Sequence, residues 1–215
     1  MEALVITGGQ CPPPEFLKRL AAHATLVIAA DSGLDAARGA GIQPDVVVGD
    51  FDSLNDLAGL DSIPQENILT FPREKDDTDT EIAIQTAWNK GFDYVVLAGG
   101  GGGRLDHLLA VWALFARERT PQEWHTGSDS VYLLEKGKSA AFKVSPGVMV
   151  SVFPAGCEGS KGMSSSGLKW PLNSLTWDEG RYGISNESTG GEVHISAGSS
   201  SLLIILPLGC ERLSE

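Results

Sequence analysis

Asp45-Val-Val-Val-Gly-Asp50-Phe-Asp52-Ser-Leu54 joins three consecutive valines to two closely spaced acidic residues, and this stretch decides the fold prediction. An unbroken apolar run of this kind is typical of a strand buried on both faces of a parallel sheet. Asp50 and Asp52 are two residues apart, so their side chains point to the same side of an extended chain. Paired carboxylates can bind a hard cation such as Mg²⁺. The stretch therefore predicts a central strand that ends in a metal site.

Apolar strand-like segments alternate with helix-like segments on both sides of this stretch. Strands are expected at residues 3–7, 25–30 and 94–98 in addition to the valine run, and helices at residues 15–22, 34–38, 81–89 and 105–115. Strands rich in Val, Ile and Leu that are separated by helices indicate a parallel sheet covered on both faces. We therefore expect an α/β, Rossmann-like fold for the first half, with ligands at the carboxyl edge of its sheet.

A second acidic cluster, Lys75-Asp76-Asp77-Thr78-Asp79-Thr80-Glu81, precedes one of these helices. Thr78 and Glu81 have the spacing of a capping box, which predicts the start of the helix. Clustered carboxylates raise one another's proton affinity unless a cation lies among them. We therefore expect a metal or phosphate site, with a solvated acidic rim as the alternative. The candidate residues are Asp31, Asp50, Asp52, Asp76 and Asp79.

Five glycines, Gly99 to Gly103, are followed by Arg104-Leu-Asp106-His107 at the start of an expected helix. The run matches neither the dinucleotide-binding nor the P-loop pattern. Backbone N–H groups, a guanidinium and an imidazole at a helix start can nevertheless bind a phosphate chain. The alternatives are that Asp106 is only a favourable first-turn carboxylate and that His107 is an ordinary surface histidine.

The second half of the chain changes character after about Gly127. Helical periodicity disappears, and short β-rich segments are separated by Gly, Ser and Pro. Strands are expected at residues 131–134, 140–144, 148–153, 192–196 and 201–206. This pattern predicts an antiparallel β-sandwich. We expect two domains, residues 1–127 and residues 128–215; Trp170 and Trp177 of the second either pack or stack on a heterocycle.

Composition excludes several classes of partner. The net charge of −12 over 215 residues argues against nucleic acid, because phosphate backbones require stripes of Lys and Arg. The longest apolar run, Leu202 to Leu208, is too short to cross a bilayer. Three cysteines without metal-ligand spacing fit a reducing compartment. We therefore expect a cytoplasmic protein with no membrane or nucleic-acid partner.

Four motifs of the first half, taken in order, closely resemble the thiamine pyrophosphokinase family. They are Ala30-Asp31-Ser-Gly33, Gly49-Asp50-Phe-Asp52-Ser53, Lys75-Asp76-x-Thr78-Asp79 and Gly103-Arg104-x-Asp106-His107. In the second half, Gly167-Leu168-Lys169-Trp170-Pro-Leu172 and Ser185-Asn186 are similar to the thiamine-binding β-domain of that family. The resemblance extends over nearly the whole chain.

The resemblance implies a Mg²⁺-dependent homodimer that transfers a pyrophosphoryl group from ATP to the hydroxyl of thiamine and releases AMP. It implies that Asp50, Asp52, Asp76 and Asp79 form the catalytic centre, with Asp50, Asp52 and Asp79 as metal ligands. Asp31, Gly33, Arg104, Asp106 and His107 would bind the nucleotide, and Trp170, Ser185 and Asn186 would bind thiamine. Each site would be shared between two subunits.

Two other functions remain open. A strand that ends in Asp-x-Asp is also how haloacid-dehalogenase-like phosphatases present a nucleophilic aspartate, here Asp50. The order of elements weakens this reading, because two strand-helix units precede the motif. The other alternative is a protein that binds nucleotide or thiamine without turning either over.

Overall fold

The computed structural model describes residues 1–51, 60, 63–72, 74, 76–156, 159–175, 177 and 182–213. The predicted ligand Asp52 and the motif residue Lys75 lie outside these described residues. The chain divides into two compact units. The N-terminal unit comprises Met1–Val111 and Trp124–Gly127, and the C-terminal unit comprises Trp112–Glu123 and Ser128–Glu215.

A parallel sheet forms the centre of the N-terminal unit, as the sequence predicts. Its strands are β1 (Glu2–Ile6), β2 (Leu26–Ala30), β3 (Val46–Gly49), β4 (Ile68–Thr70) and β5 (Tyr94–Ala98), with β6 (Glu123–His125) beside β5. The order is β5-β1-β2-β3-β4, and every pair among these five is parallel. The carboxyl ends of these strands therefore meet at one edge of the sheet.

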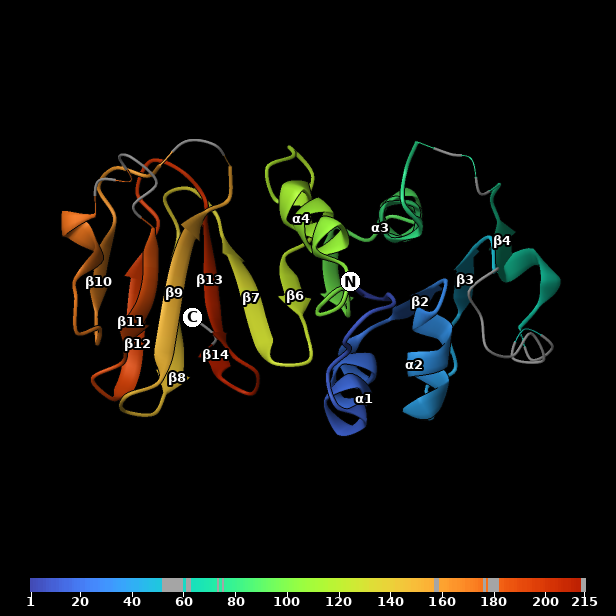
Figure 1. Cartoon of the computed structure of the whole chain (residues 1–215), viewed down its shortest axis with the longest axis horizontal. Coiled ribbons are helices and arrows are strands. Elements are labelled where there is room, and N and C mark those ends of the chain that lie inside the picture. Colours follow the sequence, from blue (N-terminus) through green and yellow to red (C-terminus); the bar gives the residue numbers. More distant parts are fainter. Residues whose placement is uncertain are drawn as a thin grey trace. The chain divides into compact units, whose positions relative to one another are not determined.

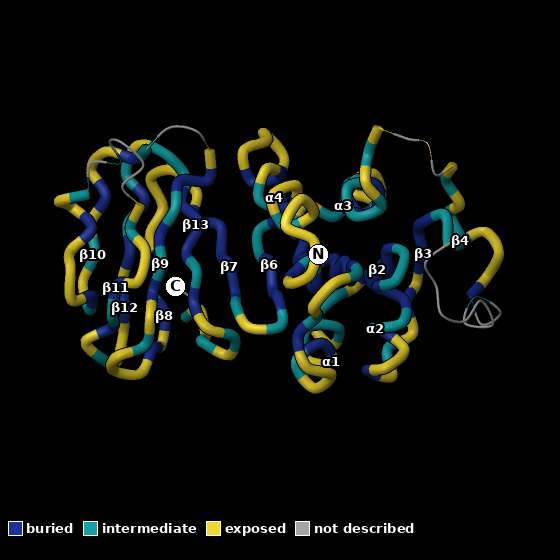
Figure 2. Tube along the Cα trace, viewed as in Figure 1, coloured by how far each residue is buried: buried dark blue, intermediate teal, exposed yellow. Residues whose placement is uncertain are grey.

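Helices cover both faces of this sheet. Helices α1 (Pro14–His23) and α2 (Gly33–Gly39) lie on one face, where Leu17 and Ala37 pack against Leu4 and Ile6 of β1. Helix α3 (Asp79–Asn89) lies on the other face and contacts β1, β2 and β3 (Figure 1). The strands between the two helical layers are almost entirely buried (Figure 2). The predicted α/β architecture is confirmed.

The predicted capping box fixes the start of α3. The Glu81 N–H donates to Thr78 Oγ1 at 3.2 Å, and the Thr78 N–H donates to Glu81 Oε2 at 2.9 Å. Two backbone donors at the helix start are thereby satisfied by a reciprocal pair of side chains. This cap holds the acidic segment before α3 at a defined position.

Helix α4 (Leu105–Leu114) agrees with its predicted range, but its apolar positions are not all buried. Phe115 is buried, whereas Leu105 and Leu109 are 68% and 55% exposed. Helical spacing of apolar residues predicts an apolar face on the helix. It does not predict how much of that face is buried by other elements. Among the described residues, no helix is both long enough and apolar enough to cross a membrane.

The C-terminal unit consists of two antiparallel sheets with one core between them, which confirms the predicted sandwich. On one side of the core the strand order is β11-β9-β13-β7, which is the antiparallel part of a longer sheet, and on the other side it is β10-β12-β8-β14. Phe142, Leu134 and Leu202 are fully buried in the shared core. The strands are β7 (Asp129–Leu134), β8 (Ser139–Val144), β9 (Met149–Pro154), β10 (Ser164–Ser166), β11 (Gly183–Glu187), β12 (Gly191–Ser196), β13 (Leu202–Pro207) and β14 (Glu211–Leu213).

Candidate functional site

Two of the predicted acidic residues lie side by side at the carboxyl edge of the N-terminal sheet. Asp31 follows β2 and Asp50 follows β3, and the Asp31 N–H donates to the carbonyl of Val48 at 2.8 Å. Asp31 has a left-handed backbone with φ of 47°, which turns the chain sharply from β2 into α2. A Cβ built on Gly49 would lie 3.3 Å from the Asp31 Cα. The carboxyl ends of β2 and β3, which Asp31 and Asp50 follow, are thus in close contact.

The starts of α2 and α3 both meet the end of β1 at this edge. A Cβ built on Gly33, in the first turn of α2, would lie 2.1 Å from the carbonyl oxygen of Ile6, so only glycine allows this approach. On the other face, the hydroxyls of Thr7 and Thr80 share a hydrogen bond of 2.6 Å. Because Thr80 is the second residue of α3, this bond places Asp79 at the same edge.

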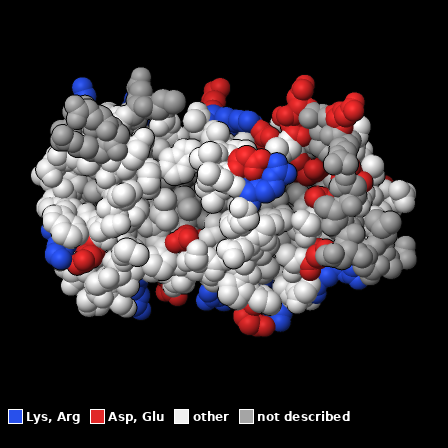
Figure 3. Space-filling view, viewed as in Figure 1, with Lys and Arg blue, Asp and Glu red and all other residues white. Residues whose placement is uncertain are grey.

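Asp31, Asp50 and Asp79 are therefore brought together at one sheet edge from three different elements. All three are partly buried, and the Oδ1 atoms of Asp31 and Asp79 are shielded from solvent. Asp76 lies in the same acidic segment but is exposed. Carboxylates gather around α3 and the segment that leads into it (Figure 3). Among the described residues, no group of three or more His, Cys, Asp and Glu side chains could hold a metal ion.

The glycine run beyond β5 is packed into the fold. The N–H of Gly99 donates to the carbonyl of His125 at 2.9 Å, and that of Gly100 donates to the carbonyl of Gly8 at 2.7 Å. These two N–H groups are used inside the protein, so they are not available to a ligand. The phosphate site expected at Gly103 and Arg104, at the start of α4, does not involve these two groups and stays a prediction.

Arg104 and Asp106 form an exposed ion pair at the start of α4. Arg104 Nε donates to Asp106 Oδ1 at 3.1 Å, and Arg104 Nη2 donates to Asp106 Oδ2 at 2.5 Å. The hydrogen bonds from Arg104 lower the pKa of the Asp106 carboxyl, and the same contact raises the pKa of Arg104. His107 is exposed in the same helical turn. Asp106 is therefore paired with Arg104. It also occupies the first turn of a helix, where a carboxylate is favourable.

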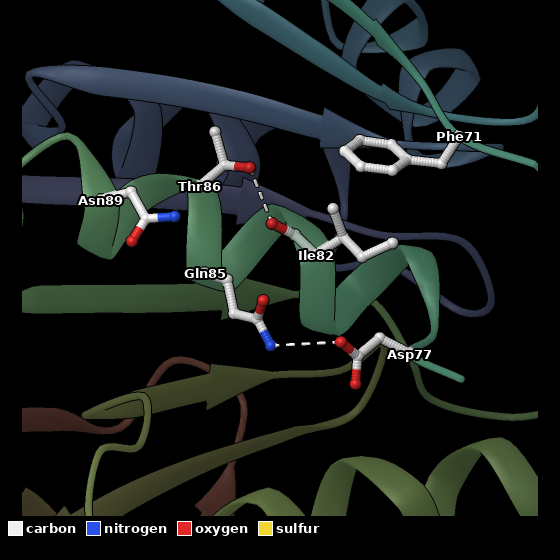
Figure 4. Close-up of a pocket in the computed structure, with 6 residues that line it drawn as sticks. All are labelled: Phe71, Asp77, Ile82, Gln85, Thr86 and Asn89. Atoms are coloured by element: carbon white, nitrogen blue, oxygen red, sulfur yellow. Dashed lines mark hydrogen bonds between the residues drawn. The ribbon is translucent and has the colours of Figure 1, made fainter. Parts of the chain in front are cut away.

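A hollow of about 320 Å³ runs along α3 on the side that carries Ile82, Thr86 and Asn89 (Figure 4). Phe71, which follows β4, forms one wall, and Asp77 lies at the end nearest the helix start. The Nε2 of Gln85 reaches Asp77 Oδ2 at 3.5 Å, and the Thr86 hydroxyl donates to the carbonyl of Ile82 at 2.7 Å. The hollow adds polar groups that the sequence motifs did not include.

A second hollow, of about 230 Å³, lies in the C-terminal unit and is lined by Trp170. The sequence left open whether Trp170 and Trp177 pack in the core or stack on a ligand. Trp170 is 52% exposed at this hollow, beside Tyr182 and Ile184. Trp177 is instead packed against the core, with its Nε1 donating to the carbonyl of Ser160 at 3.0 Å. Of the two tryptophans, Trp170 is therefore the one that a ligand can reach.

Ser185 and Asn186 lie in β11 near this hollow but in different environments. Ser185 is exposed and has a left-handed backbone with φ of 55°. Asn186 is buried, and its side-chain amide is hydrogen-bonded to both backbone groups of Trp170. The sequence motif identified both residues but contained no signal for this internal contact.

Tyr182, Ile184 and the Thr7 to Thr80 bond were not identified from the sequence. Single exposed apolar residues are common on protein surfaces, so they carry no signal for a site until their neighbours are known. Hydroxyl pairs between elements distant in sequence have no local signature. In the sequence, the one available signal for Tyr182 and Ile184 is that they follow the Gly-Leu-Lys-Trp segment in the chain and closely precede Ser185.

The fold and its two sites define a class of two-unit proteins. A parallel α/β unit carries acidic groups at its carboxyl edge, and an antiparallel β unit carries an exposed aromatic hollow. Family models agree with this division: "Thiamin pyrophosphokinase, catalytic domain" matches residues 17–123, and "Thiamin pyrophosphokinase, vitamin B1 binding domain" matches residues 140–202. The chain belongs to the thiamine pyrophosphokinase family.

Individual relatives support this assignment. A thiamine pyrophosphokinase of Bacillus subtilis is 32% identical over 109 residues, which are 49% of this chain and 50% of that protein. The crystal structure of thiamine pyrophosphokinase from the same organism has a TM-score of 0.79 at 24% identity and covers 97% of this chain and 100% of its own. The enzyme from Geobacillus thermodenitrificans has a TM-score of 0.74 at 25% identity, covering 100% of this chain and 98% of its own. The aligned sequence thus spans half the length of the curated relative.

Proposed function

We propose that this protein is a thiamine pyrophosphokinase, which transfers the pyrophosphoryl group of ATP to the hydroxyl of thiamine and gives thiamine diphosphate and AMP. One observation carries the proposal: the two family models match in the order of the two structural units. The acidic sheet edge falls within the first model, and the Trp170 hollow falls within the second.

In this proposal the acidic edge of the N-terminal unit binds Mg²⁺ and the phosphates of ATP. Asp50, Asp52 and Asp79 are the proposed metal ligands, and carboxylate oxygens are the donors that Mg²⁺ prefers. Asp50 and Asp79 are partly buried at one sheet edge, and Asp52 follows Asp50 by two residues in the sequence. Bound Mg²⁺ would neutralise charge that develops on the phosphates during transfer.

The protein's own groups would position the nucleotide and the alcohol. Arg104, whose guanidinium is already oriented by Asp106, would bind phosphate oxygens, and His107 would lie at the same end of the nucleotide. Asp31 and Gly33 would contact the nucleotide at the start of α2. A primary alcohol is a weak nucleophile, so either Asp76 or Asp79 would accept its proton. Alignment of the two substrates would supply most of the remaining acceleration.

In the C-terminal unit, Trp170, Ser185 and Asn186 would form the thiamine site. Trp170 offers an accessible indole for stacking on the aminopyrimidine ring. We also propose that the protein is a cytoplasmic homodimer in which each site is completed by two subunits. A two-fold dimer would form both sites with one type of interface.

Incubation of the purified protein with Mg²⁺, ATP and thiamine tests the proposed activity. We expect thiamine diphosphate and AMP in equal amounts, measured by chromatography. The Asp50→Ala variant should remain folded by circular dichroism and should lose at least about 100-fold in turnover, because a metal ligand at the reacting phosphates is lost.

The two other functions give different results in the same experiment. A phosphatase would release inorganic phosphate from phosphate esters without thiamine, and a phosphoryl group would be trapped on Asp50. A binding protein would bind ATP or thiamine by calorimetry and form no product. Either result would overturn the proposed activity.

A further inference from the structure

The segment that carries Trp170 is held against β11 by a ladder of backbone hydrogen bonds that stops short of Trp170 itself. The Thr189 N–H donates to the carbonyl of Gly167 at 2.8 Å, and the Lys169 N–H donates to the carbonyl of Glu187 at 2.8 Å. Leu168 and Ser188 form the bridge between these two bonds. Trp170 follows Lys169 in the chain and lies beyond these two bonds.

The side chain of Asn186 binds the backbone of Trp170 at this point. Trp170 N–H donates to Asn186 Oδ1 at 3.1 Å, and Asn186 Nδ2 donates to the carbonyl of Trp170 at 2.6 Å. Asn186 Oδ1 also accepts the N–H of Glu187 at 2.9 Å. An amide side chain offers the same donor and acceptor as a peptide group, so it can bind the N–H and the carbonyl of one residue together. The direction of both bonds also fixes which amide atom is oxygen and which is nitrogen.

The backbone of β11 is irregular just before Asn186. Ser185 has φ of 55°, and the pairing of β11 with β9 shifts register between Gly183 and Asn186. A left-handed residue of this kind turns the backbone out of the strand direction, as in a bulge. The buried amide of Asn186, which follows this irregular residue, makes the contact with Trp170.

The clamp fixes the backbone of a residue whose ring is accessible at the hollow. Lys169 Nζ lies 4.7 Å from the centroid of the Trp170 ring and 2.9 Å from Glu187 Oε2, so one ring face is covered by a paired cation. A planar ligand would therefore stack on the opposite face of the ring. The orientation of the indole determines whether that face is open to the ligand. The ring angle depends in turn on the Trp170 backbone that Asn186 holds.

We infer that Asn186 is a positioning residue that sets the Trp170 indole for stacking on a planar heteroaromatic ligand and does not itself bind that ligand. Both lone pairs of its carbonyl oxygen and one of its two amide hydrogens are engaged within the protein. This inference rests on the proposed function in one respect, namely that the ligand at the hollow is thiamine.

A double-mutant cycle on thiamine binding separates positioning from direct contact. Calorimetry without ATP would compare the wild type, Asn186→Ala, Trp170→Ala and the double variant. If Asn186 acts only through Trp170, its removal should weaken thiamine binding about tenfold in the wild type and less than about twofold in the Trp170→Ala background. A tenfold loss that persists without Trp170 would overturn the inference, because it requires a contact between Asn186 and thiamine.

A second readout does not depend on thiamine. Fluorine NMR of protein labelled with 5-fluorotryptophan should show a shifted or broadened Trp170 resonance in Asn186→Ala, with the resonance assigned by Trp170→Phe. Asn186→Asp provides a variant of equal size that keeps the acceptor and removes the donor, and it should perturb the same resonance. Ser139→Ala serves as the control. It removes an exposed hydrogen bond to Ser196 on the other sheet and should leave the Trp170 resonance unchanged.

An unchanged Trp170 resonance in folded Asn186→Ala and Asn186→Asp would overturn the clamp. A wild-type protein that does not bind thiamine would instead contradict the proposed function. The fluorine spectra would still test the clamp in that case, so failure of one conclusion is distinguishable from failure of the other.

Discussion

Arg104 and Asp106 illustrate how a single pair of exposed residues can prepare a phosphate site. Two of the five guanidinium N–H donors of Arg104 are aligned with the Asp106 carboxylate, so the planar fork is oriented before a ligand arrives. The lowered pKa of Asp106 means that the pair persists at neutral pH and is lost only as the pH falls through that lowered value. Near neutral pH, Asp106 should therefore contribute no inflection to nucleotide binding.

Arg104→Lys tests this role at the residue scale. The substitution keeps the charge and removes the fork, so we expect the KM for ATP to rise about tenfold, which corresponds to about 1.4 kcal/mol. The KM for thiamine should change less than about twofold. Asp106→Asn should raise the same KM for ATP by a smaller factor, because Arg104 keeps its charge but loses its orienting partner. Steady-state kinetics with each substrate varied in turn would measure both values, and equal rises in the two KM values would contradict a nucleotide-specific role.

At the scale of elements, the sequence predicted those features that depend on local pattern. The valine run predicted β3, and the Thr78 to Glu81 spacing predicted the start of α3, because burial on both faces and capping both leave a local signature. Strands β10 and β11 were not predicted. β10 is three serines, and β11 contains only one large apolar residue, Ile184, so neither shows the alternation of a half-buried strand.

The candidate site was predicted to a similar extent. Asp31, Asp50 and Asp79 of the motifs lie at one sheet edge, because parallel strands place their carboxyl ends together, and their roles in binding and catalysis stay predictions. The Asn186 contact with Trp170 was not predictable, because it depends on a left-handed Ser185 and on segments 16 residues apart in the chain. The predicted ligand Asp52 lies outside the described residues, so its role remains a prediction.

Tyr132 of β7 gives a prediction about the stability of the sandwich. Its hydroxyl donates to the carbonyl of Cys210 at 3.1 Å, its ring lies 5.3 Å from that of Phe142, and burial raises its pKa from 10.0 to about 12. The folded protein therefore holds this proton more tightly than the unfolded chain does. Its contribution to stability is complete below pH 10 and is lost as the pH rises toward 12.

We expect the free energy of unfolding to fall between pH 10 and 12 by about 2 to 3 kcal/mol more in the wild type than in Tyr132→Phe. Urea unfolding followed by circular dichroism at pH 8 and at pH 11.5 would measure the difference. At pH 8 the variant should be less stable by about 1 kcal/mol, because one hydrogen bond is lost. The same alkaline loss in both proteins would show that other groups dominate the titration.

On the scale of the whole molecule, the net charge and the presence of two structural units are consistent with the proposed thiamine pyrophosphokinase activity. A net charge of −12, with carboxylates concentrated around α3, is unfavourable for a polyanion and favourable for the approach of a cation such as thiamine. The anionic co-substrate would require local neutralisation by Mg²⁺ and Arg104. The proposal therefore assigns ATP to the N-terminal unit and thiamine to the C-terminal unit, with each site completed across a homodimer.

Mixing two inactive variants tests this assignment in the assembled protein. Asp50→Ala damages only the N-terminal unit and Trp170→Ala only the C-terminal unit, so each homodimer should have little activity. If sites are shared between subunits, exchange produces heterodimers in which one of the two sites carries neither lesion. Complete exchange in an equal mixture makes half of the dimers heterodimers, so about a quarter of wild-type activity should return.

The control for this experiment replaces Trp170→Ala with the double variant Asp50→Ala, Trp170→Ala. No heterodimer between that chain and Asp50→Ala contains an intact site, so activity should not recover although exchange proceeds. Exchange itself would be followed by native mass spectrometry with one variant isotopically labelled. If heterodimers form and the first mixture stays inactive, each site is completed within one chain, since every chain in that mixture carries a lesion. A wild-type protein that is monomeric in the same measurement would exclude the shared site directly, because a single chain that turns over ATP and thiamine needs no second subunit to complete its site.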